Sequence, residues 1–106
     1  MICVIATIEV NEGRREAFLQ EFNRIVPAVR EENGCIEYAP MVDLPTSIAA
    51  QPPERSDAVT VVEKWESVEA LETHFIAPHM IEYKKAVKDV VKAMSIRILE
   101  PADRKR

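Results

Sequence analysis

Residue types that support proton transfer and aromatic binding gather in the second half of the chain, at Trp65, His74, His79 and Tyr83. A histidine side chain, with an ordinary pKa of about 6.5, is the usual proton acceptor at neutral pH. Trp and Tyr rings provide flat walls for an aromatic ligand. His79 and Tyr83 are four residues apart, so they would lie on one face of a helix. These residues suggest a pocket in which a flat ligand binds beside a proton acceptor.

A carboxylate near the end of an expected strand joins the same group of candidates. The run Ala58–Trp65 is rich in β-branched residues, which favours a strand, and alternation would place Glu63 and Trp65 on one face. His74 would lie on the apolar side of the following helix. If helices cover the Glu63–Trp65 face, these three side chains line one cavity between sheet and helices. The alternative is that Glu63 pairs with a cation across the sheet, such as Arg97.

Each of these residues also has a purely structural interpretation. A histidine on the apolar face of a helix is more often a hydrogen-bonded core residue than a catalyst. Trp65 at a strand end is more often core than pocket wall, and Met80 and Tyr83 have the helical spacing of a packing stripe. Residue types alone therefore indicate a small α+β protein with a histidine-bearing pocket.

Motifs for metal, phosphate or serine chemistry are absent from the sequence. His74 and His79 are five residues apart rather than the four of a helical zinc pair, and no cysteine or carboxylate cluster completes a site. There is no glycine-rich phosphate loop and no G-x-S-x-G. The two cysteines, Cys3 and Cys35, are too few for a disulfide framework.

Charge and hydropathy argue against several classes of partner. A formal net charge of -4 is unfavourable for nucleic-acid binding, which needs a basic face. No stretch approaches the roughly 20 apolar residues that span a bilayer. The apolar start of the chain lacks the basic segment of a signal peptide. The expected location is the cytoplasm.

Hydrophobic periodicity predicts strands at 2–10, 35–42, 58–65 and 94–99, and helices at 14–32, 67–75 and 78–93. Pro27 falls inside the first helix and should kink or end it. The segment 44–57 contains three prolines and no periodicity, so we expect a long functional loop that borders the pocket mouth. The order β-α-β, loop, β-α-α-β predicts an α+β, ferredoxin-like, four-stranded antiparallel sheet with helices on one face.

Two of the expected strands are apolar on both faces. The first carries Val4 and Ile8 on one side and Cys3 and Ile5 on the other. Helices can cover only one face of such a sheet, and a wet face should alternate with polar residues. A second copy of the same sheet is the economical cover, so the sequence predicts a homodimer.

Several segments resemble bacterial quinol monooxygenases of the antibiotic biosynthesis monooxygenase superfamily. The most specific is the block W-E-S at 65–67, L-E-x-H at 71–74 and P-H-M at 78–80. Further similar segments are I-V-P-A-V at 25–29, E-E-N-G-C at 31–35, Y-A-P-M-V-D at 38–43, E-K-W-E-S at 63–67 and I-R-I-L-E-P at 96–101. The resemblance covers nearly the whole chain in order, and its main departures lie in the first helix and the 46–55 loop. It implies one domain at 1–100 with a short charged tail at 101–106.

The resemblance implies a dimeric α+β barrel that oxidises hydroquinones, menadiol-like naphthoquinols in particular, with molecular oxygen and without flavin, haem or metal. A quinolate is electron-rich enough to reduce oxygen itself, so the protein needs only to bind the ring, remove a proton and exclude water. In this hypothesis His74 accepts the proton, and His79 or Tyr83 orients the other hydroxyl. The substrate contacts would come from Trp65, Glu63, Tyr38, Met41 and Met80.

Two alternatives remain open at this stage. The first is a haem-degrading monooxygenase of the same superfamily, although that branch has an asparagine on its first strand and residues 1–10 contain none. The second is a non-catalytic ligand-binding or stress-response dimer with a pocket of the same shape.

Overall fold

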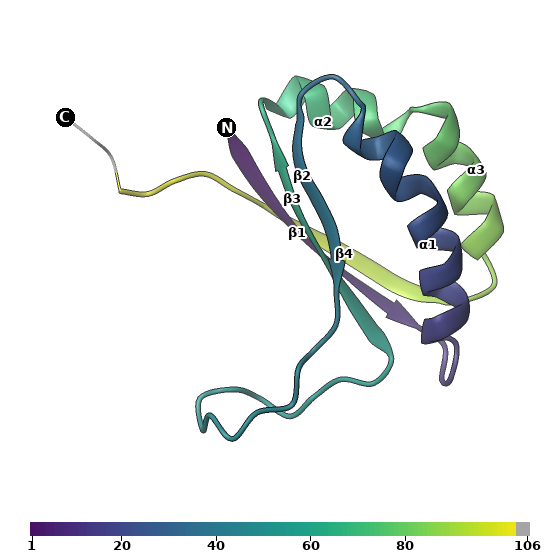
Figure 1. The fold of residues 1–106 in the computed structure, drawn as a ribbon, viewed down its shortest axis with the longest axis vertical. Helices are drawn as coiled ribbons and strands as arrows, with labels where there is room; N and C mark the ends of the chain where they lie inside the picture. Colours follow the sequence, from purple (N-terminus) through teal and green to yellow (C-terminus); the bar gives the residue numbers. More distant parts are fainter. Residues whose placement is uncertain (104–106) are drawn as a thin grey trace.

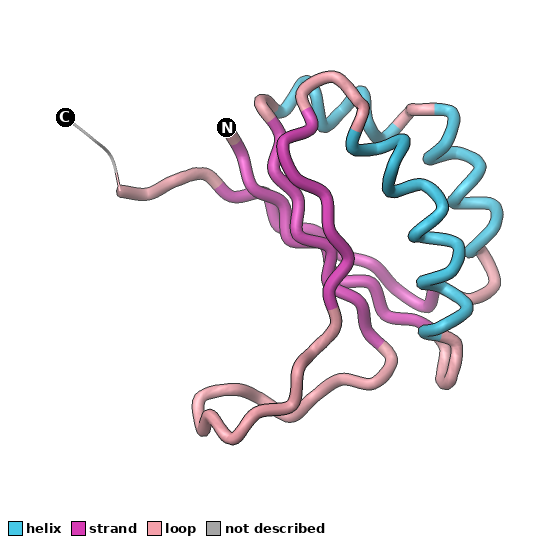
Figure 2. Tube along the Cα trace, viewed as in Figure 1, coloured by secondary structure: helices cyan, strands magenta, loops and turns pink. Residues whose placement is uncertain are grey.

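A computed structural model of the chain describes residues 1–103, and it confirms the expected α+β class (Figures 1 and 2). The elements are β1 (Ile2–Val10), α1 (Arg15–Arg30), β2 (Cys35–Met41), β3 (Ala58–Trp65), α2 (Val68–Phe75), α3 (Pro78–Val87) and β4 (Val91–Leu99). The four strands form one sheet in the order β2-β3-β1-β4, and all neighbouring pairs are antiparallel. The three helices lie on one side of this sheet, which is the ferredoxin-like arrangement (Figure 1).

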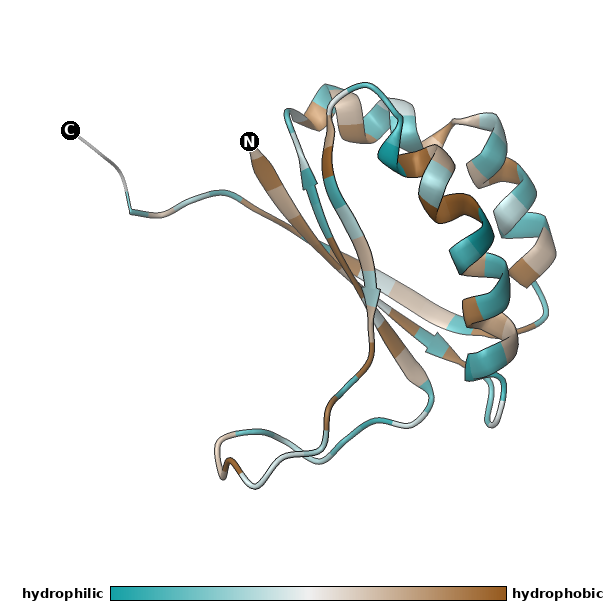
Figure 3. Ribbon diagram, viewed as in Figure 1, coloured by the Kyte–Doolittle hydropathy of each residue, from teal (hydrophilic) through white to brown (hydrophobic). Residues whose placement is uncertain are grey.

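The core lies between the helices and the sheet. Figure 3 marks the hydrophobic residues along the strands and helices that contribute to it. Strand pairing aligns Val4, Ala6 and Ile8 of β1 with Glu63, Val61 and Val59 of β3, so these side chains share one face. Their partners on α1 recur at helical spacing, as the sequence pattern predicts, and are buried: Phe18, Phe22, Ile25 and Val29. Burial of these aromatic and aliphatic groups is the main force that holds helix to sheet.

The first helix continues through Pro27 and ends at Arg30, two residues before the expected limit. A proline loses one backbone hydrogen bond, but Val29, in the last turn, is fully buried and keeps that turn against the core. Pro27 therefore does not end the helix.

The boundary between α3 and β4 differs from the sequence prediction. The helix ends at Val87 instead of continuing to residue 93, and β4 begins at Val91 instead of residue 94. Two long-range contacts account for the change: the Asn11 amide donates to the Val90 carbonyl at 2.9 Å, and Val91 pairs with Val10. Pairing with β1 therefore overrides the helical periodicity of this segment.

The opposite face of the sheet is not covered by any helix (Figure 1). It carries Cys3, Ile5 and Val62, which are half-buried by their neighbours within the sheet. Arg97 pairs with Ile5 and shares this face, whereas Glu63 is on the helix side, so the alternative ion pair of these two residues does not form.

Residues 42–57 contain no helix or strand and extend away from the helices (Figure 1). Asp43 and Arg55 close the base of this loop with a bidentate ion pair, both contacts being 2.8 Å. Of the expected tail, residues 101–103 belong to no helix or strand, and Arg104, Lys105 and Arg106 lie outside the described residues. None of the described helices is long and apolar enough to cross a membrane.

The turn between α1 and β2 is packed directly against α2. Gly34 has φ +88°, and a Cβ placed on it would lie 2.6 Å from the Cβ of Ala70. The Gly34 carbonyl accepts a hydrogen bond from the Glu66 amide at 2.8 Å. Ser67 then caps α2 by accepting from the Ala70 amide at 3.1 Å. Glycine at this position therefore sets how closely α2 approaches the end of α1.

We expect Gly34→Ala to destabilise the fold by about 2–4 kcal/mol, because the new methyl group adds a clash with Ala70 to the cost of a left-handed backbone. Gly13→Ala is the matched control: Gly13 also has a positive φ, +76°, but no atom lies within 4 Å of the added Cβ. Chemical denaturation of both variants measures the difference. Equal losses of stability would contradict close packing at Gly34.

Candidate active site

A cavity of about 370 Å³ lies between the helix-facing side of the sheet and the helices. Its polar lining groups are contributed by Tyr38, Glu63, His74 and Tyr83, with Lys84 and Lys88 also present. The rest of its wall is mainly apolar: Ala6, Ile8, Phe22, Val61, Phe75, Met80, Val87, Val91, Met94 and Ile96. A largely apolar cavity with a few converging polar groups is the usual form of a small-molecule site.

A carboxylate bridges the two histidines of the chain. The Nδ1 atom of His74 lies 3.1 and 3.0 Å from the two oxygens of Glu32, and Nε2 of His79 lies 2.5 Å from Oε2. Because a carboxylate only accepts hydrogen bonds, both of these nitrogens carry hydrogen. The side-chain exposure rises along the series, from 2% at His74 to 13% at Glu32 and 27% at His79.

The bridge determines which nitrogen of His74 is available to a ligand. With Nδ1–H donated to Glu32, the lone pair of the neutral ring is on Nε2. Nε2 has no hydrogen-bond partner among residues 1–103. Every fully buried polar side-chain atom in that range does have a partner, so Nε2 is not fully buried. Nε2 is therefore accessible, and since His74 lines the cavity, this atom is presented to it.

Burial lowers the pKa of His74, and the hydrogen bond and charge of Glu32 only partly oppose this effect. The ring is accordingly neutral at neutral pH and able to accept a proton. Aromatic rings surround it, with centroid distances of 4.7 Å to Trp65, 5.4 Å to Tyr38 and 5.7 Å to Phe75. These contacts restrict the orientation of the imidazole.

Glu63 is the second acid–base group of the cavity. It is 6% exposed, and its Oε1 accepts a 2.9 Å hydrogen bond from the indole N–H of Trp65. Burial raises the pKa of Glu63 to about 7; the Trp65 hydrogen bond opposes the rise, and the charge of Glu32 adds to it. A carboxyl group with this pKa exchanges its proton near neutrality, which suits an acid–base role.

The two tyrosines of the cavity remain protonated. Burial, together with the charge of Glu63, raises the pKa of both Tyr38 and Tyr83 well above the ordinary value. Each hydroxyl can therefore donate a hydrogen bond to a ligand. The rings pack on Phe22, with Tyr38 stacked at 5.5 Å and Tyr83 edge-on at 5.6 Å, so these three residues form one aromatic part of the cavity wall.

The structure brings together five of the residues that the sequence indicated: Tyr38, Glu63, His74, Met80 and Tyr83 all line the cavity. The remaining three do not line it.

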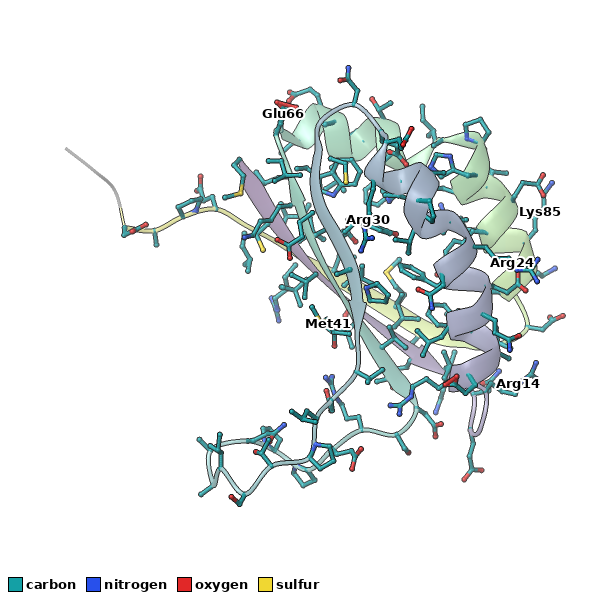
Figure 4. All side chains as sticks on the ribbon, in the orientation of Figure 1. Arg14, Arg24, Arg30, Met41, Glu66 and Lys85 are labelled. Carbon is teal, nitrogen blue, oxygen red and sulfur yellow. The ribbon has the colours of Figure 1, made fainter. Side chains whose placement is uncertain are left out.

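Trp65, which is fully buried, lies behind Glu63 and His74 and holds the carboxyl group in place. His79 does not line the cavity; it contacts Glu32, and its side chain is more exposed to solvent than that of Glu32. Met41 (labelled in Figure 4) pairs with Thr60 and is 48% exposed on the opposite face of the sheet. Side chains alternate along β2, so with Tyr38 directed to the helices Met41 must point away, and its expected role as a wall of this cavity is wrong.

The long loop also has a different position from the one expected. No residue of the segment 44–57 lines the cavity, which opens beside α3 and β4 instead. Because the loop leaves the sheet on the side away from the helices, its expected place at the mouth of this cavity is wrong (Figure 1).

Sequence reasoning missed Glu32, Phe22 and the two lysines of the cavity. In the sequence Glu32 appears only within the E-E-N-G-C segment at 31–35, and nothing local connects it to histidines 42 and 47 residues later. Lys84 and Lys88 have i, i+4 spacing on the same helix face as Met80, which is a signal that could have been used. Among the described residues, no group of three His, Cys, Asp or Glu side chains has the arrangement of a metal site.

Comparison with known proteins places these residues in a family. Residues 1–86 match the antibiotic biosynthesis monooxygenase family. A protein of Escherichia coli K12 named "Probable quinol monooxygenase YgiN" is 45% identical over 103 residues, which cover 95% of this chain and 98% of that protein.

Solved structures show the same fold. PA3566 from Pseudomonas aeruginosa has a TM-score of 0.77 at 25% identity, covering 94% of this chain and 92% of that one. Rv0793 from Mycobacterium tuberculosis also has a TM-score of 0.77, at 22% identity, covering 99% and 98%. The match over residues 1–86 and the 45% identity to the Escherichia coli protein show that the chain belongs to the antibiotic biosynthesis monooxygenase family of enzymes.

Proposed function

We propose that this protein oxidises hydroquinones, menadiol-like naphthoquinols in particular, with molecular oxygen and without a bound cofactor. The observation that carries the proposal is the accessible Nε2 of a buried, neutral His74 in a cavity with aromatic walls. The name of the Escherichia coli relative points to the same substrate class. A cavity of about 370 Å³ is at the small end of ligand sites, which suits one or two fused rings.

The chemistry assigns a role to each polar group. His74 Nε2 accepts a proton from one quinol hydroxyl, and Glu32 stabilises the imidazolium that forms, because it already accepts the Nδ1 hydrogen. The resulting quinolate transfers electrons to oxygen. In total the quinol loses two electrons and two protons and becomes the quinone, and molecular oxygen accepts the two electrons and two protons and becomes hydrogen peroxide. Tyr83 donates a hydrogen bond to the second ring oxygen, and Glu63 exchanges the second proton.

We also propose that the enzyme acts in the cytoplasm as a homodimer. The dimer is supported by the uncovered face of the sheet, where Cys3, Ile5 and Val62 form an apolar strip beside Lys64 and Arg97 that none of the described helices covers (Figure 1). A second copy of that face would remove this strip from water.

His74→Gln should lower the rate of oxygen uptake with menadiol by about 10²–10⁴, the usual contribution of a positioned proton acceptor. Glutamine can still donate to Glu32, so the fold should persist. In the unmodified enzyme the rate should rise with pH through the ionisation of His74, at a pH below the ordinary 6.5, because burial lowers its pKa.

Oxygen uptake, corrected for autoxidation, is the measurement for a panel of naphtho- and benzohydroquinols. If turnover per folded molecule were unchanged in His74→Gln, His74 would be a structural residue. If the unmodified protein bound quinones without consuming oxygen, it would be a ligand-binding protein and the proposed activity would be wrong.

The raised pKa of Glu63 has a consequence for stability. The folded state holds this proton up to a pH of about 7, whereas an unfolded chain releases it near 4.5, so stability falls as pH rises between these values. Glu63→Gln keeps an acceptor for Trp65 and removes this dependence. The stability of the variant relative to the unmodified protein should increase from pH 4.5 to 8 by up to about 3 kcal/mol. Denaturation at several pH values measures this difference in stability. If the difference stayed constant with pH, the pKa of Glu63 would not be raised.

Ile5→Lys should dissociate the dimer, because the charge would be buried at the centre of the apolar strip. Ile76→Lys is the matched control, since Ile76 is 73% exposed at the end of α2, away from that strip. Sedimentation equilibrium distinguishes the two. A folded, monomeric unmodified protein would overturn the dimer proposal.

A further inference from the structure

Two lysines lie where the cavity meets solvent. Lys84 and Lys88 are four residues apart at the end of α3, so they share a helix face, and both line the cavity while remaining exposed. Neither forms an ion pair with any residue in 1–103, although the chain as a whole is acidic, with a net charge of -4. The mouth of the cavity is therefore locally basic.

The basic mouth lies further along the cavity than Glu63, although the charge of Lys84 still reaches His74 and contributes to lowering its pKa. Strand register places Glu63 next to Tyr38 and toward α2, whereas Met94 pairs with Ile8 further along the sheet, toward the end of α3. Mainly apolar side chains lie between, among them Val61 and Val87. A ligand that fits this lining has hydroxyl groups at one end, a flat apolar body, and a negative charge at the other end.

The helix dipole alone does not explain why Lys84 and Lys88 lie at the mouth of the cavity. Cations are favoured in the last turn of any helix, where they interact with the helix dipole. Lys85 satisfies that preference equally well, yet it does not line the cavity and projects from α3 away from the sheet (Figure 4). Lys84 and Lys88 differ from Lys85 in facing the ligand site.

We propose that the cavity selects hydroquinones with an anionic substituent, such as a ring carboxylate, and that Lys84 and Lys88 bind this group at the mouth. The inference rests on the proposed quinol oxidation and adds the substrate class. The ring is held by the apolar walls, and the carboxylate is attracted to two ammonium groups that have no competing partner among the described side chains. Because both lysines are partly in water, each should contribute modestly.

The test compares a neutral and an anionic substrate, 1,4-naphthohydroquinone and 5,8-dihydroxy-2-naphthoate, in the variants Lys84→Gln, Lys88→Gln and the double variant. The carboxylate of the second compound is on the ring that carries no hydroxyl group. The readout is the ratio of kcat/KM for the carboxylate substrate to kcat/KM for the neutral one. We expect this ratio to fall on the order of tenfold in the double variant, mainly through KM of the carboxylate substrate. Raising salt should reproduce part of the loss in the unmodified enzyme.

Lys85→Gln is the matched control, because it removes the same charge from the same helix turn without changing the cavity. Its ratio should stay within about twofold of the unmodified enzyme. If the ratio were unchanged in the double variant, or if kcat/KM fell equally for both substrates, the inference would be wrong, because the lysines would then not bind the anionic substituent.

A binding measurement separates this inference from the proposed activity. Calorimetry with 5-hydroxy-2-naphthoate and 1-naphthol, which are not hydroquinones, requires no turnover. If the naphthoate binds more tightly and loses that advantage in the double variant, the ligand class is correct even where no oxygen is consumed. If both hydroquinones are oxidised but the naphthoate has no advantage, the activity stands and the inference is wrong.

Discussion

The site depends on the hydrogen bonds that the Glu32 carboxylate accepts from two histidines. This one side chain connects the turn after α1 to α2 and α3, because His74 and His79 belong to different helices. The close approach at Gly34, two residues later, is what allows α2 to come within reach. Removing the carboxylate would leave Nδ1 of a buried imidazole without its acceptor and the ring free to take the other tautomer.

Two carboxyl groups with different partners serve the site: Glu63 lines the cavity, whereas Glu32 contacts His74 without lining it. Their different partners separate their functions. Glu32 accepts from two imidazoles and serves as a fixed negative partner. Glu63 has one indole N–H and is otherwise buried, so its pKa rises to about 7. Two titratable groups whose environments differ in this way are a common basis for dividing acid and base roles in enzymes.

Much of the fold follows from local patterns. The β-branched runs identify β1 and β3, the spacing of Phe18 and Phe22 identifies α1, and Ser67 and Pro78 mark the starts of the later helices. The sequence pattern predicts the wrong boundary between α3 and β4, because Val87, Val90 and Val91 suit a helix or a strand equally well. Only pairing with Val10, far away in sequence, decides between them.

The sequence by itself determined the fold class, the shared face of Glu63 with the β3 core, and the candidate base His74, because these depend on the periods of strands and helices. Alternation along β2 should also have excluded Met41, which lies three residues after Tyr38. Tertiary structure alone decided that Glu32 joins His74 to His79, that Trp65 supports Glu63 from behind, and that two lysines reach the cavity mouth. The physical reason is that these contacts join elements whose distance in space is set by the packing of the whole core, which no local period encodes.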